Sequence, residues 1–69
     1  MKRERTAHGL VGKRVQVPVY TDTWMMGDRF GKVMKITISR IAHKEIAYVM
    51  LDKSNRTLPF VAEDCEVVS

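Results

Sequence analysis

Apolar and polar residues alternate along Leu10–Tyr20, which is the pattern of a half-buried β-strand. The residues that share the apolar side of this run are Val11, Val15, Val17 and Val19. Valine is favoured in strands because its branched side chain packs well on a pleated surface. Pro18 has no N–H to donate to a neighbouring strand, so we expect this strand to lie at a sheet edge or to end there.

A second alternating run spans Phe30–Ile38, and its predicted apolar side is formed by Phe30, Met34, Ile36 and Ile38. Gly31 lies within this run, where a glycine marks either a β-bulge or a close approach of two backbones. The connection Tyr20–Asp28 is rich in turn-forming residues and is predicted to be a long loop, with Gly27 in a turn that needs positive φ. Long loops in small domains often carry function.

Apolar residues on both sides of Glu45–Leu51 predict a central strand that is buried on both faces. Arg56–Val61 is predicted to be a further strand, and Pro59 places it at an edge or near a strand end. The other predicted elements are a polar connection over Ser39–Lys44, a tight turn over Asp52–Asn55, one helical turn over Ala62–Asp64 and a final strand over Cys65–Val68.

A chain of 69 residues is expected to form one domain, with residues 1–9 as a flexible basic tail and residues 10–69 as the folded unit. A domain of this size buries only about 60% of the surface that its unfolded chain exposes, so a homo-oligomer is one way to gain stability. The single cysteine, Cys65, has no partner for an internal disulfide and favours a reducing, cytoplasmic location. No apolar run is long enough for a membrane span, and we expect no membrane partner.

The charge is divided unevenly along the chain. Residues 1–44 hold ten Lys or Arg and three acids, a charge of +7, whereas residues 45–69 hold two Lys or Arg and five acids, a charge of −3; together they give the net +4. Such a dipolar molecule can present a basic face to a polyanion. An ordinary solvated surface of mixed charge explains the same numbers, and both interpretations stay open.

Five short strands without a long helix predict an all-β fold, a small five-stranded antiparallel barrel. The order of strands and connections resembles that of the SH3-like barrel superfold over Leu10–Val68. That superfold includes nucleic-acid-binding proteins and protein-docking subunits, so the resemblance implies binding of either kind. The size and basicity are also similar to those of small phage-encoded proteins.

A narrower resemblance covers Gly27–Ile36, which is similar to the KOW motif of certain ribosomal and transcription-elongation proteins. The matching positions are Gly31, Lys32, Val33 and Ile36, and the two glycines stand one residue further apart than is usual in the motif. The resemblance implies contact with RNA or DNA by the loop and by the strand that follows it.

The basic residues on and beside these strands, together with two rings, form the candidate nucleic-acid site. The predicted phosphate-binding side chains are Arg14, Arg29, Lys32 and Lys35, and the predicted stacking rings are Trp24 and Phe30. Trp24 has a structural alternative, in which it closes one end of the core as the largest apolar side chain of a small domain. A half-buried Trp24 with one exposed edge satisfies both interpretations.

No residues suited to catalysis or to metal binding stand out in this sequence. His8 and His43 have no carboxylate or cysteine at metal-ligand spacing, and Cys65 lies at the head of an apolar strand. We therefore expect no enzyme, no metal and no cofactor. The first hypothesis is a nucleic-acid-binding protein for RNA or DNA, and the alternative is a protein-interaction or regulatory subunit that uses the Tyr20–Phe30 loop.

Overall fold

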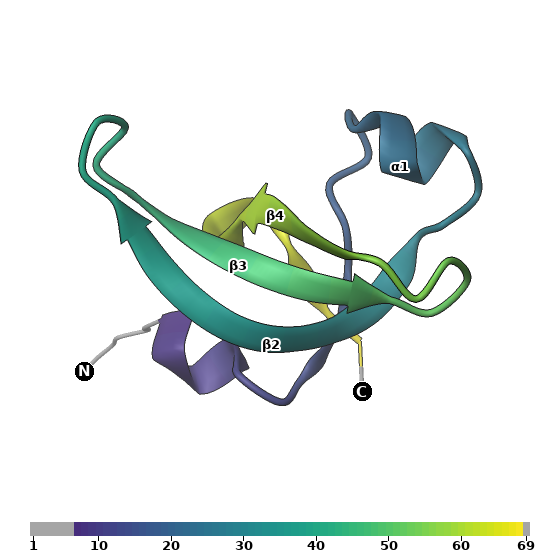
Figure 1. The fold of residues 1–69 in the computed structure, drawn as a ribbon, viewed down its shortest axis with the longest axis horizontal. Coiled ribbons are helices and arrows are strands. Elements are labelled where there is room, and N and C mark those ends of the chain that lie inside the picture. Colours follow the sequence, from purple (N-terminus) through teal and green to yellow (C-terminus); the bar gives the residue numbers. More distant parts are fainter. Residues whose placement is uncertain (1–6, 69) are drawn as a thin grey trace.

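The computed structural model describes residues 7–68, and the predicted basic tail residues Lys2, Arg3 and Arg5 lie outside the described residues. The fold is all-β, with five antiparallel strands and three short helical turns (Figure 1). The strands are β1 (Arg14–Gln16), β2 (Phe30–Ser39), β3 (Lys44–Leu51), β4 (Thr57–Val61) and β5 (Glu66–Val67). The helical turns are η1 (Ala7–Leu10), α1 (Asp22–Met25) and η2 (Ala62–Asp64).

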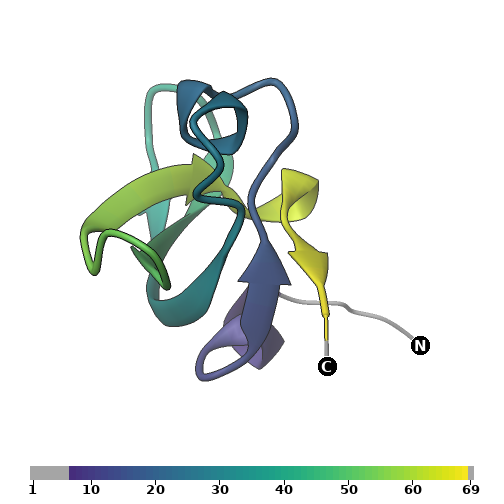
Figure 2. The ribbon, with the colours of Figure 1, turned by 90° about the vertical axis from the view of Figure 1, so that its right-hand side faces the viewer.

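The strands form one sheet in the order β4-β3-β2-β1-β5, with every described pair antiparallel. The all-β class is confirmed, but the sheet is not closed into the predicted barrel. The physical reason is that η2 carries the chain from β4 across to β1, where β5 pairs, so that β4 and β5 remain the two edges. Figure 2 shows β1 and β5 side by side, with β4 on the other side of the molecule.

The first strand is much shorter than the predicted run Leu10–Tyr20. Val15 in the strand and Val17 directly after it are fully buried, as the alternation predicts, whereas Val11 and Val19 are exposed. The strand ends at Gln16, two residues before Pro18, which agrees with the expectation drawn from that proline. Within the predicted loop, Asp22–Met25 forms the single helical turn α1.

The predicted apolar side of β2 is wrong for the first half of the strand. Gly31 and Val33 point into the core, while Phe30 is 36% exposed and Met34 is 46% exposed. The reason is a β-bulge: Val33 lies opposite Val49 and Lys35 lies opposite Tyr48, which leaves Met34 as one extra residue on β2. Beyond Met34 the alternation is reversed, so Ile36 packs against the core as predicted, while Ile38 near the strand end is exposed.

Gly31 lies where β2 passes closest to β3. A Cβ atom added at Gly31 would stand 2.5 Å from the carbonyl oxygen of Met50 and 2.6 Å from Cγ1 of Val49. Real Cβ atoms do not approach other atoms so closely, and a backbone oxygen cannot turn away as a flexible side chain does. Of the two roles predicted for Gly31, the close approach of two backbones is therefore the one that the structure shows. The β-bulge lies three residues further along β2, at Met34.

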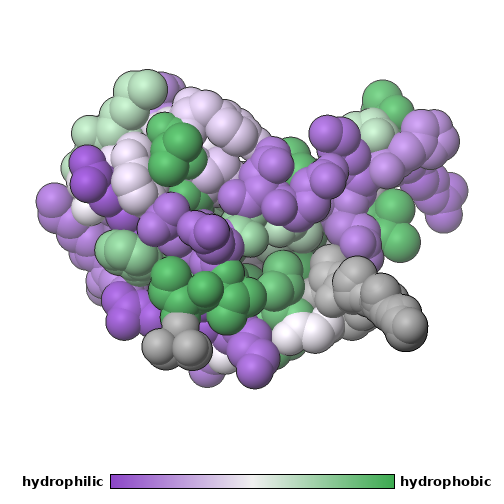
Figure 3. All heavy atoms as spheres, turned by 180° about the vertical axis from the view of Figure 1, so that it is seen from behind, coloured by the Kyte–Doolittle hydropathy of each residue, from purple (hydrophilic) through white to green (hydrophobic). Residues whose placement is uncertain are grey.

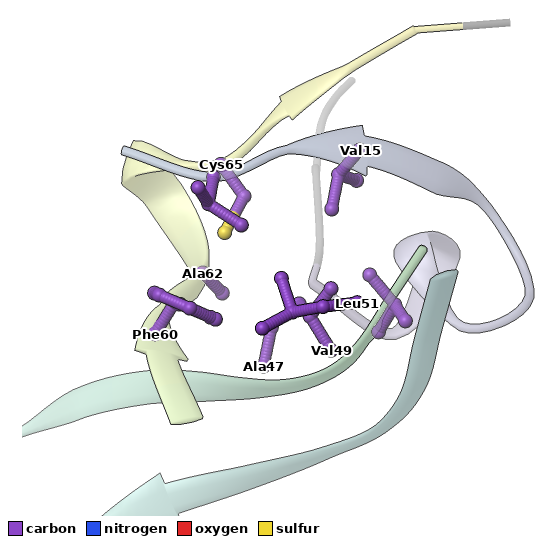
Figure 4. Packing of buried hydrophobic residues seen from close by; sticks show 9 residues of the cluster. Val15, Ala47, Val49, Leu51, Phe60, Ala62 and Cys65 are labelled. Atoms are coloured by element: carbon purple, nitrogen blue, oxygen red, sulfur yellow. The ribbon is translucent and has the colours of Figure 1, made fainter. Parts of the chain in front are cut away.

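The core lies between the two ends of the bent sheet (Figure 4). Its buried members come from β1 and the segment after it, β2, β3, β4 and the η2–β5 region, and are Val15, Val17, Val33, Ala47, Val49, Leu51, Phe60, Ala62 and Cys65. The strand β3 supplies three of them on one face, but Ile46 and Tyr48 on its other face are half-buried and Met50 is exposed. The prediction that β3 is buried on both faces is therefore wrong, because no second layer covers that face in the described part of the chain.

Substitution of Gly31 tests the close approach of β2 to β3. Gly31→Ala is expected to lower the free energy of unfolding by about 1–3 kcal/mol, because the added methyl group forces two packed backbones apart. For a domain of this size, each kcal/mol corresponds to a fall of about 4–8 °C in Tm. The measurement is thermal unfolding followed by circular dichroism.

Gly9→Ala is the matched control, because a Cβ at Gly9 would have no neighbouring atom within 4 Å. Its Tm is expected to stay close to that of the wild type. Equal Tm values for the two variants would contradict the close packing of β2 on β3.

Candidate nucleic-acid interface

The side of the sheet that faces away from the core is called the outer face here, and three of the predicted cations lie on it. Arg14 on β1 stands directly opposite Lys32 on β2, and both alternate with core residues of their strands. Lys35 lies on the same face because of the bulge, and stands opposite Tyr48 on β3. If β2 had no bulge at Met34, the Lys35 side chain would point towards the core, as Gly31 and Val33 do.

Two of these cations rest on aromatic rings of the outer face. The guanidinium carbon of Arg14 lies 5.5 Å from the ring centroid of Phe30, and Nζ of Lys35 lies 5.0 Å from that of Tyr48. Contacts within about 6 Å of a ring centroid are favourable, and at exposed sites contribute about 0.5–1 kcal/mol. The rings therefore limit the motion of two long, exposed basic side chains.

Arg14 also pairs with the carboxylate of Asp52, which follows β3. Both side chains are about half exposed, and the pair offsets part of the positive charge of the outer face. Neither Asp52 nor Tyr48 was among the predicted site residues. In the sequence, Asp52 is recognisable only as a turn-forming residue. Its contact with Arg14 joins residues that are 38 positions apart, so local sequence patterns carry no signal for this contact.

Trp24 and Arg29 form a separate pair in the α1 region rather than a part of the outer face. Trp24 is half-buried and packs against the core, which agrees with the expectation of partial burial. The guanidinium carbon of Arg29 lies 4.5 Å from the centroid of the Trp24 ring, and Nε of Arg29 donates a hydrogen bond of 3.1 Å to the Trp24 carbonyl oxygen. The predicted set of six residues is therefore divided into four on the outer face and two at α1.

The position of α1 is set by capping and turn residues. The Thr21 hydroxyl oxygen accepts a hydrogen bond from the Trp24 N–H at 3.2 Å and donates one to the Pro18 carbonyl oxygen at 2.7 Å. Gly27 ends this segment with φ of 91°, a conformation that glycine adopts without the steric cost of a Cβ. The sequence-based prediction of positive φ at Gly27 is confirmed.

Asp28 is a buried carboxylate that joins the α1 segment to the β3–β4 turn. Its two oxygens accept backbone hydrogen bonds from the N–H of Lys53 at 3.1 Å and of Ser54 at 3.2 Å. The Ser54 side chain and these two N–H groups favour the charged form and hold the pKa of Asp28 below its ordinary value. Asp28 thus supports the loop that carries Trp24 and Arg29.

An acidic groove of about 310 Å³ lies at the end of β1, and its lining includes the paired residues Gln16 and Glu66. Glu63, Asp64 and Glu66 line one side of it, and Tyr20 donates a hydrogen bond from its hydroxyl to Asp64, which raises the pKa of Tyr20. Cys65 also lines the groove, and burial raises the pKa of its thiol to about 11. A thiol that stays protonated at neutral pH is a poor nucleophile, so this groove contains no activated cysteine.

Exposed apolar side chains gather at two further places. Met25 and Met26 at the end of α1 are 70% and 71% exposed, and Tyr20 and Val19 before α1 are exposed as well. Figure 3 shows other apolar atoms gathered on the face seen from behind. Val11 and Val67 are among the exposed apolar residues of the described chain.

Comparison with protein-family models, with curated proteins and with solved structures found no match to this chain. None of the helices in residues 7–68 is long and apolar enough to cross a membrane. Within the same residues, no group of three or more His, Cys, Asp or Glu side chains is arranged to hold a metal ion.

The lowered pKa of Asp28 predicts how its contribution to stability depends on pH. Because the folded state holds this carboxylate at a pKa below the ordinary 3.8, its contribution is complete above pH 3.8 and is lost as the pH falls through the lowered value. Asp28→Asn is expected to lower Tm by several degrees at pH 7, and this difference is expected to shrink in acid. The measurement is Tm of both proteins from pH 7 to pH 2.

Asp22→Asn is the control for Asp28→Asn, because Asp22 is an exposed carboxylate on the neighbouring α1. It removes the same charge without removing the two hydrogen bonds from the turn. If Asp22→Asn and Asp28→Asn gave the same loss at pH 7, the role assigned to the Asp28 hydrogen bonds would be wrong.

Proposed function

We propose that this protein binds nucleic acid through its outer face, by contacts with phosphates and without strong sequence specificity. The observation that supports the proposal is the grouping of Arg14, Lys32 and Lys35 on one exposed face of neighbouring strands. Basic side chains that neutralise phosphates supply most of the affinity of sequence-independent binding. Contacts of this kind set the position of a protein on a duplex or a strand and carry no sequence information directly.

Two of the three cations are spaced along β2, and the third lies beside one of them on β1. Arg14 and Lys32 face each other on paired strands, about 5 Å apart at their Cα atoms. Lys35 follows along β2 after the bulge, at a distance of roughly 10 Å from Lys32. Along one nucleic-acid strand the rise is about 3.4 Å per nucleotide, so the distance from Lys32 to Lys35 spans about three nucleotides.

The aromatic rings assist this binding by holding cations in place. Phe30 lies under Arg14 and Tyr48 lies under Lys35, so these two side chains lose less conformational entropy when a phosphate is bound. A ring that is covered by a cation is also less open to stack on a base, which favours phosphate contacts over base contacts. Stacking of a base on Trp24 or Phe30 stays a prediction, and it requires Arg29 or Arg14 to move off the ring that it covers.

The resemblance of Gly27–Ile36 to the KOW motif supports the same proposal, because it implies contact with RNA or DNA at this loop and strand. Lys32, one of the matching positions, lies at the centre of the outer face between Arg14 and Met50. We propose binding without catalysis, and a cytoplasmic location in keeping with the lone, reduced Cys65.

Salt dependence tests the phosphate contacts. If Arg14, Lys32 and Lys35 each neutralise one phosphate of a duplex, the slope of log K against log salt is expected to be about −2.7, from about −0.9 for each phosphate. Lys32→Gln is expected to make this slope shallower by about 0.9 and to weaken binding equally on unrelated sequences. The measurement is fluorescence anisotropy with labelled RNA and DNA over a salt series.

Lys53→Gln is the matched control, because it removes the same charge from the β3–β4 turn. Its slope is expected to equal that of the wild type. Asp52→Asn acts in the opposite sense, since it frees Arg14 from its ion pair, and is expected to raise affinity. Failure of the wild type to bind any oligonucleotide at low salt would end the proposal, and an unchanged slope in Lys32→Gln would remove Lys32 from the site.

A second candidate function is docking of a protein partner through the Tyr20–Phe30 loop, favoured by the exposure of its methionines. Met25 and Met26 are both about 70% exposed and adjacent, and flexible methionines are common at adaptable binding surfaces. Trp24 is less suitable as a test of this loop than the sequence suggests, because it packs against the core and its removal disturbs the fold.

The double variant Met25→Ser/Met26→Ser tests the docking function. It is expected to keep the Tm of the wild type, because neither side chain is buried, and to lose a partner that the wild type retains on an affinity column. The control is Met34→Ser on β2, which is also exposed but lies outside the loop. Equal retention by wild type and double variant would exclude the loop as the docking surface.

A further inference from the structure

The β2–β3 hairpin extends past the rest of the sheet as a two-stranded ribbon. Pairing of β3 with β4 ends at Ile46 and Val61, whereas β2 and β3 continue to pair through Ser39 and Lys44. Figure 1 shows this end of the hairpin projecting on the side of the molecule opposite α1. The last residues of the ribbon and its turn, Ser39–Lys44, are called the hairpin tip.

The hairpin tip combines an apolar apex with basic flanks. Ile41 is 95% exposed, the highest value among the exposed large apolar residues of the described chain. Residues 39–44 contain Arg40, His43 and Lys44 and no acidic residue. Lone exposed apolar side chains are common on protein surfaces, but Ile41 is accompanied by a second exposed isoleucine, Ile38, on the same ribbon.

The tip has a defined turn. The Ser39 hydroxyl oxygen accepts a hydrogen bond from the N–H of Ala42 at 3.2 Å, and His43 has φ of 54°. Where the turn of the tip ends, Nζ of Lys44 lies 3.9 Å from a carboxylate oxygen of Glu63 on η2, so this cation of the tip has an acidic neighbour. These contacts hold Ile41 at the apex and leave the Arg40 side chain without an ion pair within the described residues.

We propose that the hairpin tip enters the major groove of duplex DNA, with Ile41 against base edges and Arg40 on an adjacent phosphate. This proposal rests on the nucleic-acid-binding function above, and it names the duplex as the ligand. The major groove of B-form DNA, about 12 Å wide, admits a two-stranded β-ribbon. An apolar side chain within it contacts the 5-methyl group of thymine.

The tip begins on β2, the same strand that carries two cations of the outer face. Lys35 and Ser39 are four residues apart on β2, which corresponds to roughly 13 Å along the strand. A backbone held at Lys32 and Lys35 therefore passes close to the base of the ribbon. The deep and narrow major groove of A-form RNA does not admit a ribbon, so the tip distinguishes DNA from RNA duplexes.

The experiment compares binding of the wild type and Ile41→Ser to a DNA duplex and to an RNA duplex of the same sequence. The wild type is expected to bind the DNA about tenfold more tightly than the RNA, and Ile41→Ser is expected to lose this preference while its affinity for RNA stays unchanged. Val19→Ser, an exposed valine far from the tip in sequence and outside the sheet, is the control and is expected to keep the preference.

A second measurement leaves the protein unchanged and replaces thymine by uracil in the DNA duplex, which removes the 5-methyl groups. The wild type is expected to bind this duplex more weakly, and Ile41→Ser is expected to bind both duplexes equally. If the wild type binds DNA and RNA duplexes equally, binds only single strands, or shows the same preference after Ile41→Ser, the tip proposal is overturned and the outer-face proposal stands.

Two other results would also overturn the tip proposal. If the wild type binds no nucleic acid at low salt, the tip proposal and the outer-face proposal fall together. If Ile41→Ser loses binding to phosphatidylserine vesicles and keeps its affinity for DNA, the apex belongs to a membrane-surface contact instead.

Discussion

The extra residue in β2 determines both the core and the charged surface of this protein. Up to Val33 the odd-numbered residues of β2 face inward, and after the bulge at Met34 the even-numbered residues do, so that Ile36 reaches the core. The same change of phase turns Lys35 outward, to the face that Lys32 already occupies. A regular strand would bury one of the two lysines or remove Ile36 from the core, and a buried unpaired lysine is costly.

The basic and acidic residues of the molecule gather mainly in different places, although Asp52 lies beside Arg14. Arg14, Lys32 and Lys35 lie on the outer face, while Glu63 and Asp64 of η2 lie at the acidic groove near the end of β1. A polyanion that approaches such a dipolar molecule is attracted to one side and repelled by the other, which orients it before contact. The short β5 completes the sheet, and its Glu66 stands opposite Gln16, so it adds a negative charge at the β5 edge of the outer face.

Strand positions were predictable from the sequence because turn-forming residues mark their ends. Gly27 and Asp28 precede β2, and Asp52–Asn55 separates β3 from β4. Which side of β2 faces the core was not predictable from the sequence. Met34 is an ordinary apolar strand residue, and nothing in the neighbouring residues indicates that it forms a bulge with no residue opposite it on β3. The four outer-face residues were all among those named from the sequence, whereas Asp52 and Tyr48 join the site through long-range pairing that no local pattern records.

The open sheet leaves two edges, and both are poor templates for growth. A free edge offers backbone N–H and C=O groups to any extended chain, which is how sheets join into larger aggregates. In β4 the central position is Pro59, which has no N–H to give, and β5 consists of only two residues. A protein that gathers many copies along one nucleic acid would bring these edges to high local concentration, and edges of this kind allow crowding without polymerisation.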